Sequence, residues 1–296
     1  MGWGEFFALA SPMVWALAVV MFRRSGESMA PFALNLLKNT ISLALVGLTL
    51  LVLILVTAAP VPRFSPADLT IMLLSGVLGM ALADTLYLRT LNLLGAGRTG
   101  AIGALLSPFV ILFSALYLGE RLGPWQWAGF ALVMFGILVV TLKRYRTEVS
   151  PAELRRGLLI GVAAMVAMAL GVVMVKPLLE QGPFLWVVAI RLAGGVAAMM
   201  LLLSWRRQWR SLLASYRRPH PWVPTVFACV LGGYVGSLFW LAGYKLIPAS
   251  QAAIYNESQL IFMVLFAWWF LKEPIDLRRT LGVVLIVIGV LVMLLV

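Results

Sequence analysis

The sequence predicts an all-α integral membrane protein with ten transmembrane helices arranged as two inverted five-helix repeats. Three observations lead to this fold class. Hydrophobic residues make up 62% of the chain and charged residues only 11%, whereas a typical soluble domain has roughly 25% charged residues. Apolar runs of ~20 residues recur along the chain, and each matches the ~30 Å hydrocarbon layer of a bilayer. Finally, the pattern of residues 106–140 returns at 260–293, with Glu120 aligning with Glu273 and Gly129 with Gly282.

The charge balance and the cysteine count exclude several classes of protein. The formal net charge of +12 would suit a nucleic-acid binder, but the basic residues lie in short links between apolar runs, as expected of a chain oriented in a membrane. No nucleic-acid partner is therefore expected. Cys229 is the only cysteine, so an intrachain disulfide and a cysteine-rich metal site are both excluded. The first apolar run lacks a basic leader and an obvious cleavage site, and we expect it to be a retained helix.

The apolar runs define ten expected helices and a division into two repeats. The first repeat covers residues 1–142, a polar linker covers 143–156, and the second repeat covers 157–296. Because each repeat holds an odd number of helices, the second enters the membrane in the opposite sense, which makes the repeats inverted. The expected helices are at 3–22, 31–56, 67–88, 99–118, 125–142, 157–179, 183–205, 222–244, 249–271 and 277–296.

The end of each repeat carries a family resemblance. Residues 118–122 (LGERL) are followed by 127–129 (WAG), and the second copy, 271–274 (LKEP) followed by 281–282 (LG), has lysine where glycine is usual. This pattern resembles the EamA branch of the drug/metabolite transporter superfamily. The resemblance covers essentially the whole chain and implies ten helices and a transport function. It says little about cargo, because members carry amino acids, drugs, nucleotide sugars and other metabolites.

The distribution of basic residues predicts the orientation. If the N-terminus is outside, most lysines and arginines fall in links on the inner side, including the linker 143–156 and the link 206–220. The positive-inside rule then places both termini on the outer face of a cell (inner or cytoplasmic) membrane. The resemblance implies the opposite arrangement, because well-studied members of the superfamily often have both termini in the cytosol.

Four charged residues lie within expected helices: Lys38, Asp84, Arg191 and Glu257. A charge at mid-bilayer costs at least ~2.5–3.5 kcal/mol, so it usually faces a polar cavity or a partner. Each also has a purely structural interpretation. Lys38 could extend its stem to the interface, Asp84 could pair with Arg89 near a helix end, and Arg191 could pair with Glu257.

Polar residues cluster with these charges and define the candidate substrate site. Asn35, Lys38, Asn39 and Ser42 share one helix face by their spacing. Residues 255–259 (YNESQ) form a polar run, whereas their counterparts in the first repeat, 102–106 (IGALL), are apolar, so specificity is expected in the second copy. Glu257 and Asp84 are the candidate coupling residues. The candidate substrate-binding residues are Asn35, Lys38, Asn39, Arg191, Tyr234, Tyr255, Asn256, Glu257, Gln259 and Trp15.

Other positions have an expected structural function. Helices 125–142 and 277–296 should be peripheral, and their glycine seams (Gly129 with Gly136, Gly282 with Gly289) should pack either within the bundle or in a dimer. Pro108 should kink helix 99–118. Its aligned position in helix 249–271 is not proline, so the two helices need not bend alike. Glu120 and Glu273 should hold turns or helix starts rather than touch cargo.

The sequence therefore favours a secondary transporter that moves a small polar or amphipathic, amino-acid-like or drug-like metabolite by alternating access, either proton-coupled or as an exchanger. Glu257 would bind either a cargo amine or the coupling proton. A flippase for a lipid or lipid-linked metabolite is the first alternative, and a membrane-embedded enzyme is the second. No cofactor and no metal are expected. The expected partners are the small-molecule substrate and membrane lipids, with the chain as a monomer or homodimer.

Overall fold

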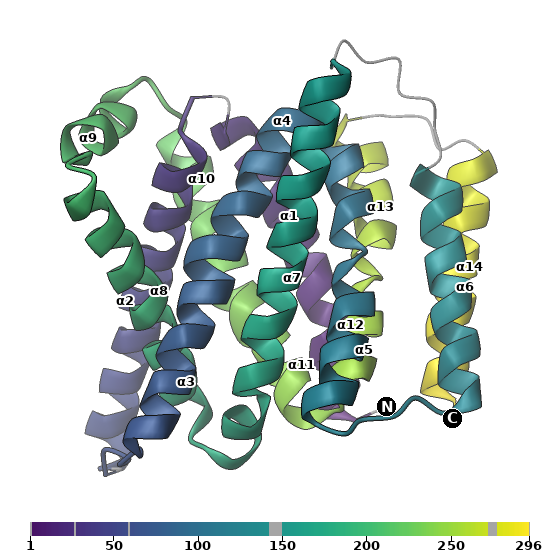
Figure 1. The fold of residues 1–296 in the computed structure, drawn as a ribbon, viewed down its shortest axis with the longest axis horizontal. Coiled ribbons are helices and arrows are strands. Elements are labelled where there is room, and N and C mark those ends of the chain that lie inside the picture. Colours follow the sequence, from purple (N-terminus) through teal and green to yellow (C-terminus); the bar gives the residue numbers. More distant parts are fainter. Residues whose placement is uncertain (1, 27, 59, 142–149, 272–276, 296) are drawn as a thin grey trace.

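In the computed structural model, residues 2–26, 28–58, 60–141, 150–271 and 277–295 are described, and the segments among them with regular secondary structure are all helical. The helices run roughly parallel and antiparallel across the molecule (Figure 1), and both chain ends lie at the same end of the bundle. The elements are α1 Trp3–Gly26, α2 Pro31–Thr57, α3 Pro66–Gly76, η1 Val77–Ala83, α4 Asp84–Gly103, α5 Leu106–Tyr117, α6 Pro124–Thr141, α7 Pro151–Gln181, α8 Phe184–Trp205, α9 Trp209–Arg217, α10 Trp222–Ala228, η2 Cys229–Gly236, α11 Ser237–Leu246, α12 Ala249–Asn256, α13 Gln259–Leu271 and α14 Leu277–Leu294.

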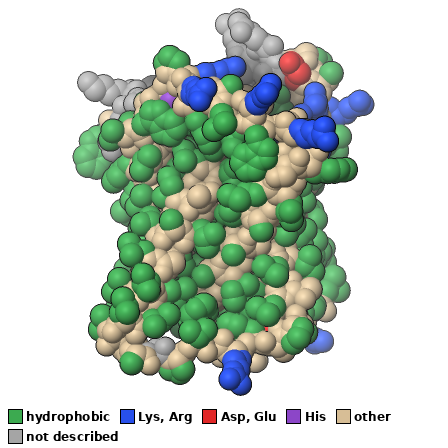
Figure 2. Space-filling view, turned by 90° about the vertical axis from the view of Figure 1, so that its left-hand side faces the viewer, with side chains coloured by type: hydrophobic (Ala, Val, Ile, Leu, Met, Phe, Trp, Pro, Cys, Tyr) green, Lys and Arg blue, Asp and Glu red, His purple; other side chains and the backbone are tan. Residues whose placement is uncertain are grey.

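The outside of the bundle has the chemistry of a membrane protein. Seven helical spans in the described part of the chain are long and apolar enough to cross a bilayer, and two shorter apolar helices lie at Pro124–Val139 and Thr280–Leu294. The face shown in Figure 2 is covered by hydrophobic side chains, while Lys and Arg gather at its two ends. The chain is therefore a multi-pass membrane protein, and the expected total of ten helices stays a prediction. The linker expected at 143–156 lies partly outside the described residues.

The two repeats share their irregular segments. The π-helical segments η1 and η2 occupy aligned positions, and so do two helix breaks, at Ala104–Leu105 between α4 and α5 and at Glu257–Ser258 between α12 and α13. π-helical segments and breaks of this kind often accompany function. The two expected helices 99–118 and 249–271 are thus broken at aligned positions, although only the first contains a proline. Pro108 is accommodated in the first turn of α5, just after the break, where its missing N–H is not needed.

The repeats are interlocked rather than placed side by side. Helix α1 packs against α11 and η2 of the second repeat, and α7 packs against α4 and η1 of the first. In the same way α2 contacts η2, and α8 contacts η1. Each repeat therefore supplies a wall for the π-helical segment of the other, and the interface between the repeats runs through the centre of the molecule.

Helices α6 and α14 form an antiparallel pair at the edge of the bundle (Figure 1). Their glycines allow close approach: a Cβ on Gly136 would lie 2.7 Å from the Gly282 carbonyl oxygen, and one on Gly289 would lie 2.7 Å from the Gly129 carbonyl oxygen. The glycine seam therefore packs within the bundle, which is one of the two arrangements expected from the sequence. The contacts of α6 with α4 and α12 attach the pair to the bundle.

The link 206–220 contains a helix that the sequence did not predict, α9. It is short and strongly basic, and short helices depend on tertiary packing for stability. That packing comes from buried Leu212, from a Tyr216 hydroxyl that donates to the Ala33 carbonyl at 2.9 Å, and from Ser215, whose hydroxyl accepts from the Ala30 N–H at 3.3 Å. None of these partners lies nearby in the sequence.

The glycine seam gives a test of the α6–α14 packing. Gly136→Ala should lower the free energy of unfolding by about 1–3 kcal/mol, because the added methyl meets the Gly282 carbonyl and Ile286. Gly47→Ala in α2 is the matched control, since a Cβ there meets nothing within 4 Å. Thermal unfolding of the purified protein would check this, and equal melting temperatures for the two variants would contradict the assigned packing.

Candidate functional site

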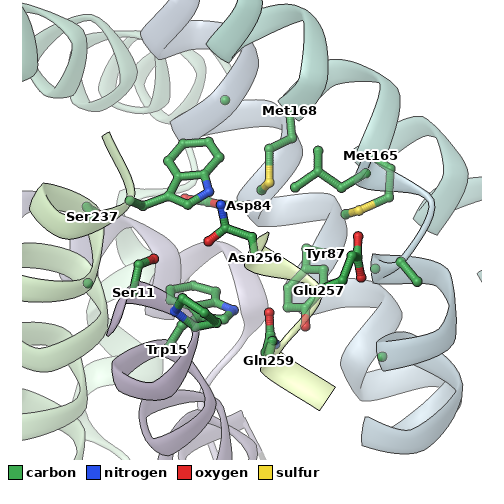
Figure 3. A pocket seen from close by; sticks show the side chains of 18 of the residues that line it. Ser11, Trp15, Asp84, Tyr87, Met165, Met168, Ser237, Asn256, Glu257 and Gln259 are labelled. Carbon is green, nitrogen blue, oxygen red and sulfur yellow. The ribbon is translucent and has the colours of Figure 1, made fainter. Parts of the chain in front are cut away.

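A cavity of about 130 Å³ lies at the centre of the bundle, between the two repeats. Both π-helical segments and the α12–α13 break border it, and its walls come from α1, α2, η1, α4, α5, α6, α7, α8, η2, α11, α12 and α13. Figure 3 shows labelled side chains from both repeats pointing toward one another across this space. The polar, charged and aromatic side chains among the lining residues are Ser11, Trp15, Lys38, Asp84, Tyr87, Arg191, Ser237, Trp240, Asn256, Glu257 and Gln259.

The cavity brings together many of the residues that the sequence singled out. Six of the candidate substrate-binding residues line it, and so do both candidate coupling residues. Because they come from helices far apart in the sequence, only the fold could place them together. Their contact with a substrate stays a prediction. The six are Trp15, Lys38, Arg191, Asn256, Glu257 and Gln259.

Lys38 is held by an ion pair inside the protein. Its Nζ donates to a carboxylate oxygen of Asp84, and the lysine is only 3% exposed. Its Nζ also lies 5.7 Å from the centre of the Trp15 ring, within the range of a cation–π contact. Two structural interpretations are thereby corrected: Lys38 does not extend to the interface, and Asp84 pairs with Lys38 rather than with Arg89, which is exposed. A buried ammonium needs a carboxylate more than an exposed guanidinium does.

Arg191 has no such partner. It is 1% exposed, and none of its three guanidinium nitrogens makes a hydrogen bond to any residue that the structure describes. Its guanidinium carbon lies 5.6 Å from the centre of the Trp240 ring. Gly79 gives it room, because a Cβ there would lie 2.6 Å from Nη2. Buried donors are nearly always hydrogen-bonded, so an unpartnered guanidinium on a cavity wall needs an explanation.

Glu257 lies at the break between α12 and α13. One of its carboxylate oxygens accepts a hydrogen bond from the Ser107 hydroxyl at 2.8 Å, across the interface between the repeats. The expected structural pair with Arg191 is not present among the ion pairs of the described residues. The break directs the carboxylate into the cavity, beside Tyr87 in Figure 3.

The remaining four candidates do not line the cavity. Asn35 and Asn39 both donate to the Met80 carbonyl, at 2.8 and 3.1 Å. Met80 belongs to η1, whose irregular backbone needs added partners for its polar groups. Tyr234 instead shares a hydrogen bond of 2.7 Å with Thr49, and the Tyr255 hydroxyl donates to the Met293 carbonyl at 3.4 Å. All four therefore have structural partners, which sequence spacing alone could not show.

Several lining residues escaped the sequence analysis. Tyr87 follows Asp84 by one helical turn and therefore shares its face. Ser237 aligns with Asp84 in the other repeat, so the internal repeat itself could have indicated it. Met165 and Met168 form an apolar wall (Figure 3). The sequence did not indicate that these two methionines line the cavity, because methionine is common in apolar helices.

Glu120 supports the site from one end of the bundle. Its carboxylate accepts hydrogen bonds from the backbone N–H groups of Ala249 and Ser250, at 2.8 and 2.9 Å, and from the Ser250 hydroxyl at 2.7 Å. These groups lie in the first turn of α12, the helix that ends directly before Glu257, so a carboxylate of the first repeat caps a helix of the second. This is the helix-start function expected for Glu120. Glu273 lies outside the described residues.

The interlocked repeats, the apolar surface and the central polar cavity define a membrane transporter. The chain belongs to the EamA-like transporter family, whose model matches residues 2–142 and 155–295. It is 26% identical over 223 residues to the uncharacterized transporter YvbV of Bacillus subtilis, covering 74% of this chain and 70% of that protein. A solved crystal structure matches with a TM-score of 0.75 at 20% identity and covers 99% of both chains, which shows the shared fold.

A shorter similarity links the chain to flippase subunits. It is 35% identical over 88 residues to a probable 4-amino-4-deoxy-L-arabinose-phosphoundecaprenol flippase subunit ArnE of Pseudomonas fluorescens, covering 30% of this chain and 67% of that protein. The corresponding protein of Erwinia tasmaniensis is 38% identical over 68 residues, covering 21% and 63%.

The Lys38–Asp84 pair can be tested by a double-variant comparison. Lys38→Met should lower the free energy of unfolding by about 3–5 kcal/mol, because it leaves a buried carboxylate without its cation. Lys38→Met combined with Asp84→Asn should recover most of that loss, since neither charge remains. The measurement is chemical or thermal unfolding of the purified protein. Additive losses in the double variant would show that the two residues are not coupled.

Proposed function

We propose that the protein is a secondary transporter that carries a small, amino-acid-like amphipathic metabolite in the central cavity. The observation that carries this proposal is Arg191, a fully buried guanidinium with no hydrogen-bond partner among the described residues, on the wall of that cavity. A cargo carboxylate is the natural partner for its donors, because guanidinium and carboxylate match in geometry and charge.

The other cavity residues fit the remainder of such a cargo. Trp240, Met165 and Met168 offer apolar and aromatic surface for a side chain. Glu257 offers a carboxylate that would bind either the cargo amine or a coupling proton, and these are the two alternatives that its position supports. Flux of cargo without chemical change, measured in proteoliposomes, would separate transport from enzymatic turnover.

The cavity size favours a small cargo. One water molecule occupies roughly 10–15 Å³ of such a cavity, so about 130 Å³ holds on the order of ten groups of that size. An amino acid is of that size. The flippase alternative is supported by the two ArnE relatives, whose names describe an amino sugar on a lipid phosphate. Such a cargo would need a larger cavity than the one in this conformation.

The paired irregular segments support alternating access. Inverted repeats allow the two-fold-related helices to exchange conformations, which opens the same site first to one side and then to the other. The aligned π-helical segments and helix breaks border this site in both repeats. The regular hydrogen-bond pattern of the helices is interrupted at these segments, so bending there should require little free energy.

For the orientation we favour the charge distribution. In Figure 2 most of the visible Lys and Arg lie at one end of the molecule, the end opposite both termini in Figure 1. The positive-inside rule makes that end cytoplasmic and the termini external, in the cell membrane. Accessibility of a tag at either terminus to an impermeant reagent on intact cells would test this.

Removing the guanidinium of Arg191 should weaken cargo binding. Arg191→Ala is expected to weaken binding by about tenfold to a hundredfold, the equivalent of losing charge-assisted hydrogen bonds. Arg191→Lys should be intermediate, since it keeps the charge but loses the planar fork. Uptake of a panel of labelled amino acids by proteoliposomes would measure this. Exposed Arg63→Ala is the matched control, and equal uptake by the Arg191 and Arg63 variants would refute the proposal.

Substitution of Glu257 distinguishes between the two proposed functions of its carboxylate, which are proton coupling and binding of the cargo amine. If it carries the coupling proton, Glu257→Gln should remove the dependence of uptake on a pH gradient while exchange of cargo across the membrane continues, because the amide cannot release a proton. If it binds the cargo amine, the variant should instead weaken binding of amino acids more than of the matching amine-free acids. Wild-type behaviour of the variant in both assays would exclude both proposed functions of Glu257.

A further inference from the structure

The internal repeat places two cations in one cavity. Lys38 in α2 and Arg191 in α8 occupy aligned positions, both are almost fully buried, and both line the cavity. Each also lies near a tryptophan ring, Trp15 for Lys38 and Trp240 for Arg191. By the two-fold relation between the repeats, the cavity would be expected to present two equivalent sites for an anion.

A single carboxylate breaks this equivalence. Asp84 pairs with Lys38, and the residue that aligns with it in the second repeat is Ser237, which lines the same cavity but has no charge. Glu257, the other lining carboxylate, accepts from Ser107. Among the described lining residues, the two cations thus differ: Lys38 has its partner and Arg191 does not.

We propose that Asp84 sets the charge selectivity of the cavity, so that the protein accepts cargo with one carboxylate and rejects cargo with two. This inference rests on the proposed function, because it assumes that the first carboxylate binds at Arg191. A second carboxylate would find Lys38 already neutralised and would approach Asp84, which repels it. Discrimination by an unfavourable charge against the wrong ligand is a common source of specificity. Asp84 is thereby a specificity-determining residue, and the Lys38–Asp84 pair is more than structural.

Two charge substitutions at aligned positions should change the binding of carboxylate ligands in opposite directions. Asp84→Asn releases Lys38, so that a dicarboxylate can engage both cations. Ser237→Asp adds a carboxylate to the cavity and brings it to the position that corresponds to Asp84, where it competes with cargo for Arg191. The double variant Lys38→Gln with Asp84→Asn removes both members of the pair and should restore preference for the monocarboxylate.

The test uses the purified full-length protein in detergent and ligands matched in length. Norleucine and 2-aminoadipate differ by one terminal carboxylate, and hexanoate and adipate repeat the comparison without the amine. Binding is measured by ligand-induced thermal shift over a concentration series. The wild type should prefer the monocarboxylate of a pair by about tenfold or more, the size of one lost charge-assisted contact. Asp84→Asn should reduce or reverse that ratio by about tenfold, and Ser237→Asp should weaken binding of both members.

The outcomes separate this inference from the function on which it rests. If Arg191→Ala abolishes binding but folded Asp84→Asn keeps the wild-type ratio, Asp84 selectivity is refuted and the cargo site stands. If none of the four ligands binds the wild type, both proposals fall. Should Asp84→Asn not fold, Ser237→Asp still decides: unchanged binding of both members of a pair by that variant would overturn the inference, and weaker binding of both members would support it.

Discussion

Lipid cannot hydrate a charge, and this constraint governs the arrangement around the four charged side chains at the centre of the molecule. Asp84 compensates Lys38, and Ser107 holds Glu257. Arg191 is the exception among the described lining residues, because its donors meet no acceptor. A protein would not retain such a group in an apolar setting without a reason. The proposed binding of a cargo anion at Arg191 would supply that reason.

Specific contacts support the irregular helices and the charged side chains around the cavity. The π-helical segment η1 has its Met80 carbonyl satisfied by two amides of α2, and its Gly79 leaves space for the guanidinium of α8. At the opposite boundary of the site, the carboxylate of Glu120 fixes the start of α12, whose other end presents Glu257. The amides of α2 belong to the same repeat as η1, whereas the contacts of Gly79 with Arg191 and of Glu120 with α12 cross from one repeat to the other. Rocking of the repeats would therefore act directly on the groups that face the cargo.

Much of this could be predicted from the sequence, because composition and repetition report directly on the environment. The apolar runs indicated a membrane protein, and the aligned motifs indicated two repeats. The buried charges indicated the site, since charge in an apolar helix is costly. What failed depended on long-range contacts. The structural interpretation of Asp84 paired it with Arg89, which is close in sequence, whereas its partner Lys38 lies in another helix. Asn35 and Asn39 belong to a polar stripe and were therefore expected to bind substrate. The stripe alone could not show that their side-chain amides donate to the backbone of η1.

The central claim is that cargo binds between the repeats with its carboxylate on Arg191. The most direct measurement is an experimental structure of the protein with the amino acid that stabilises it most. The account predicts that the cargo lies in the cavity with its carboxylate hydrogen-bonded to the guanidinium, while Lys38 remains paired with Asp84. Cargo bound outside the cavity, or a guanidinium paired with Glu257 in the loaded protein, would contradict it.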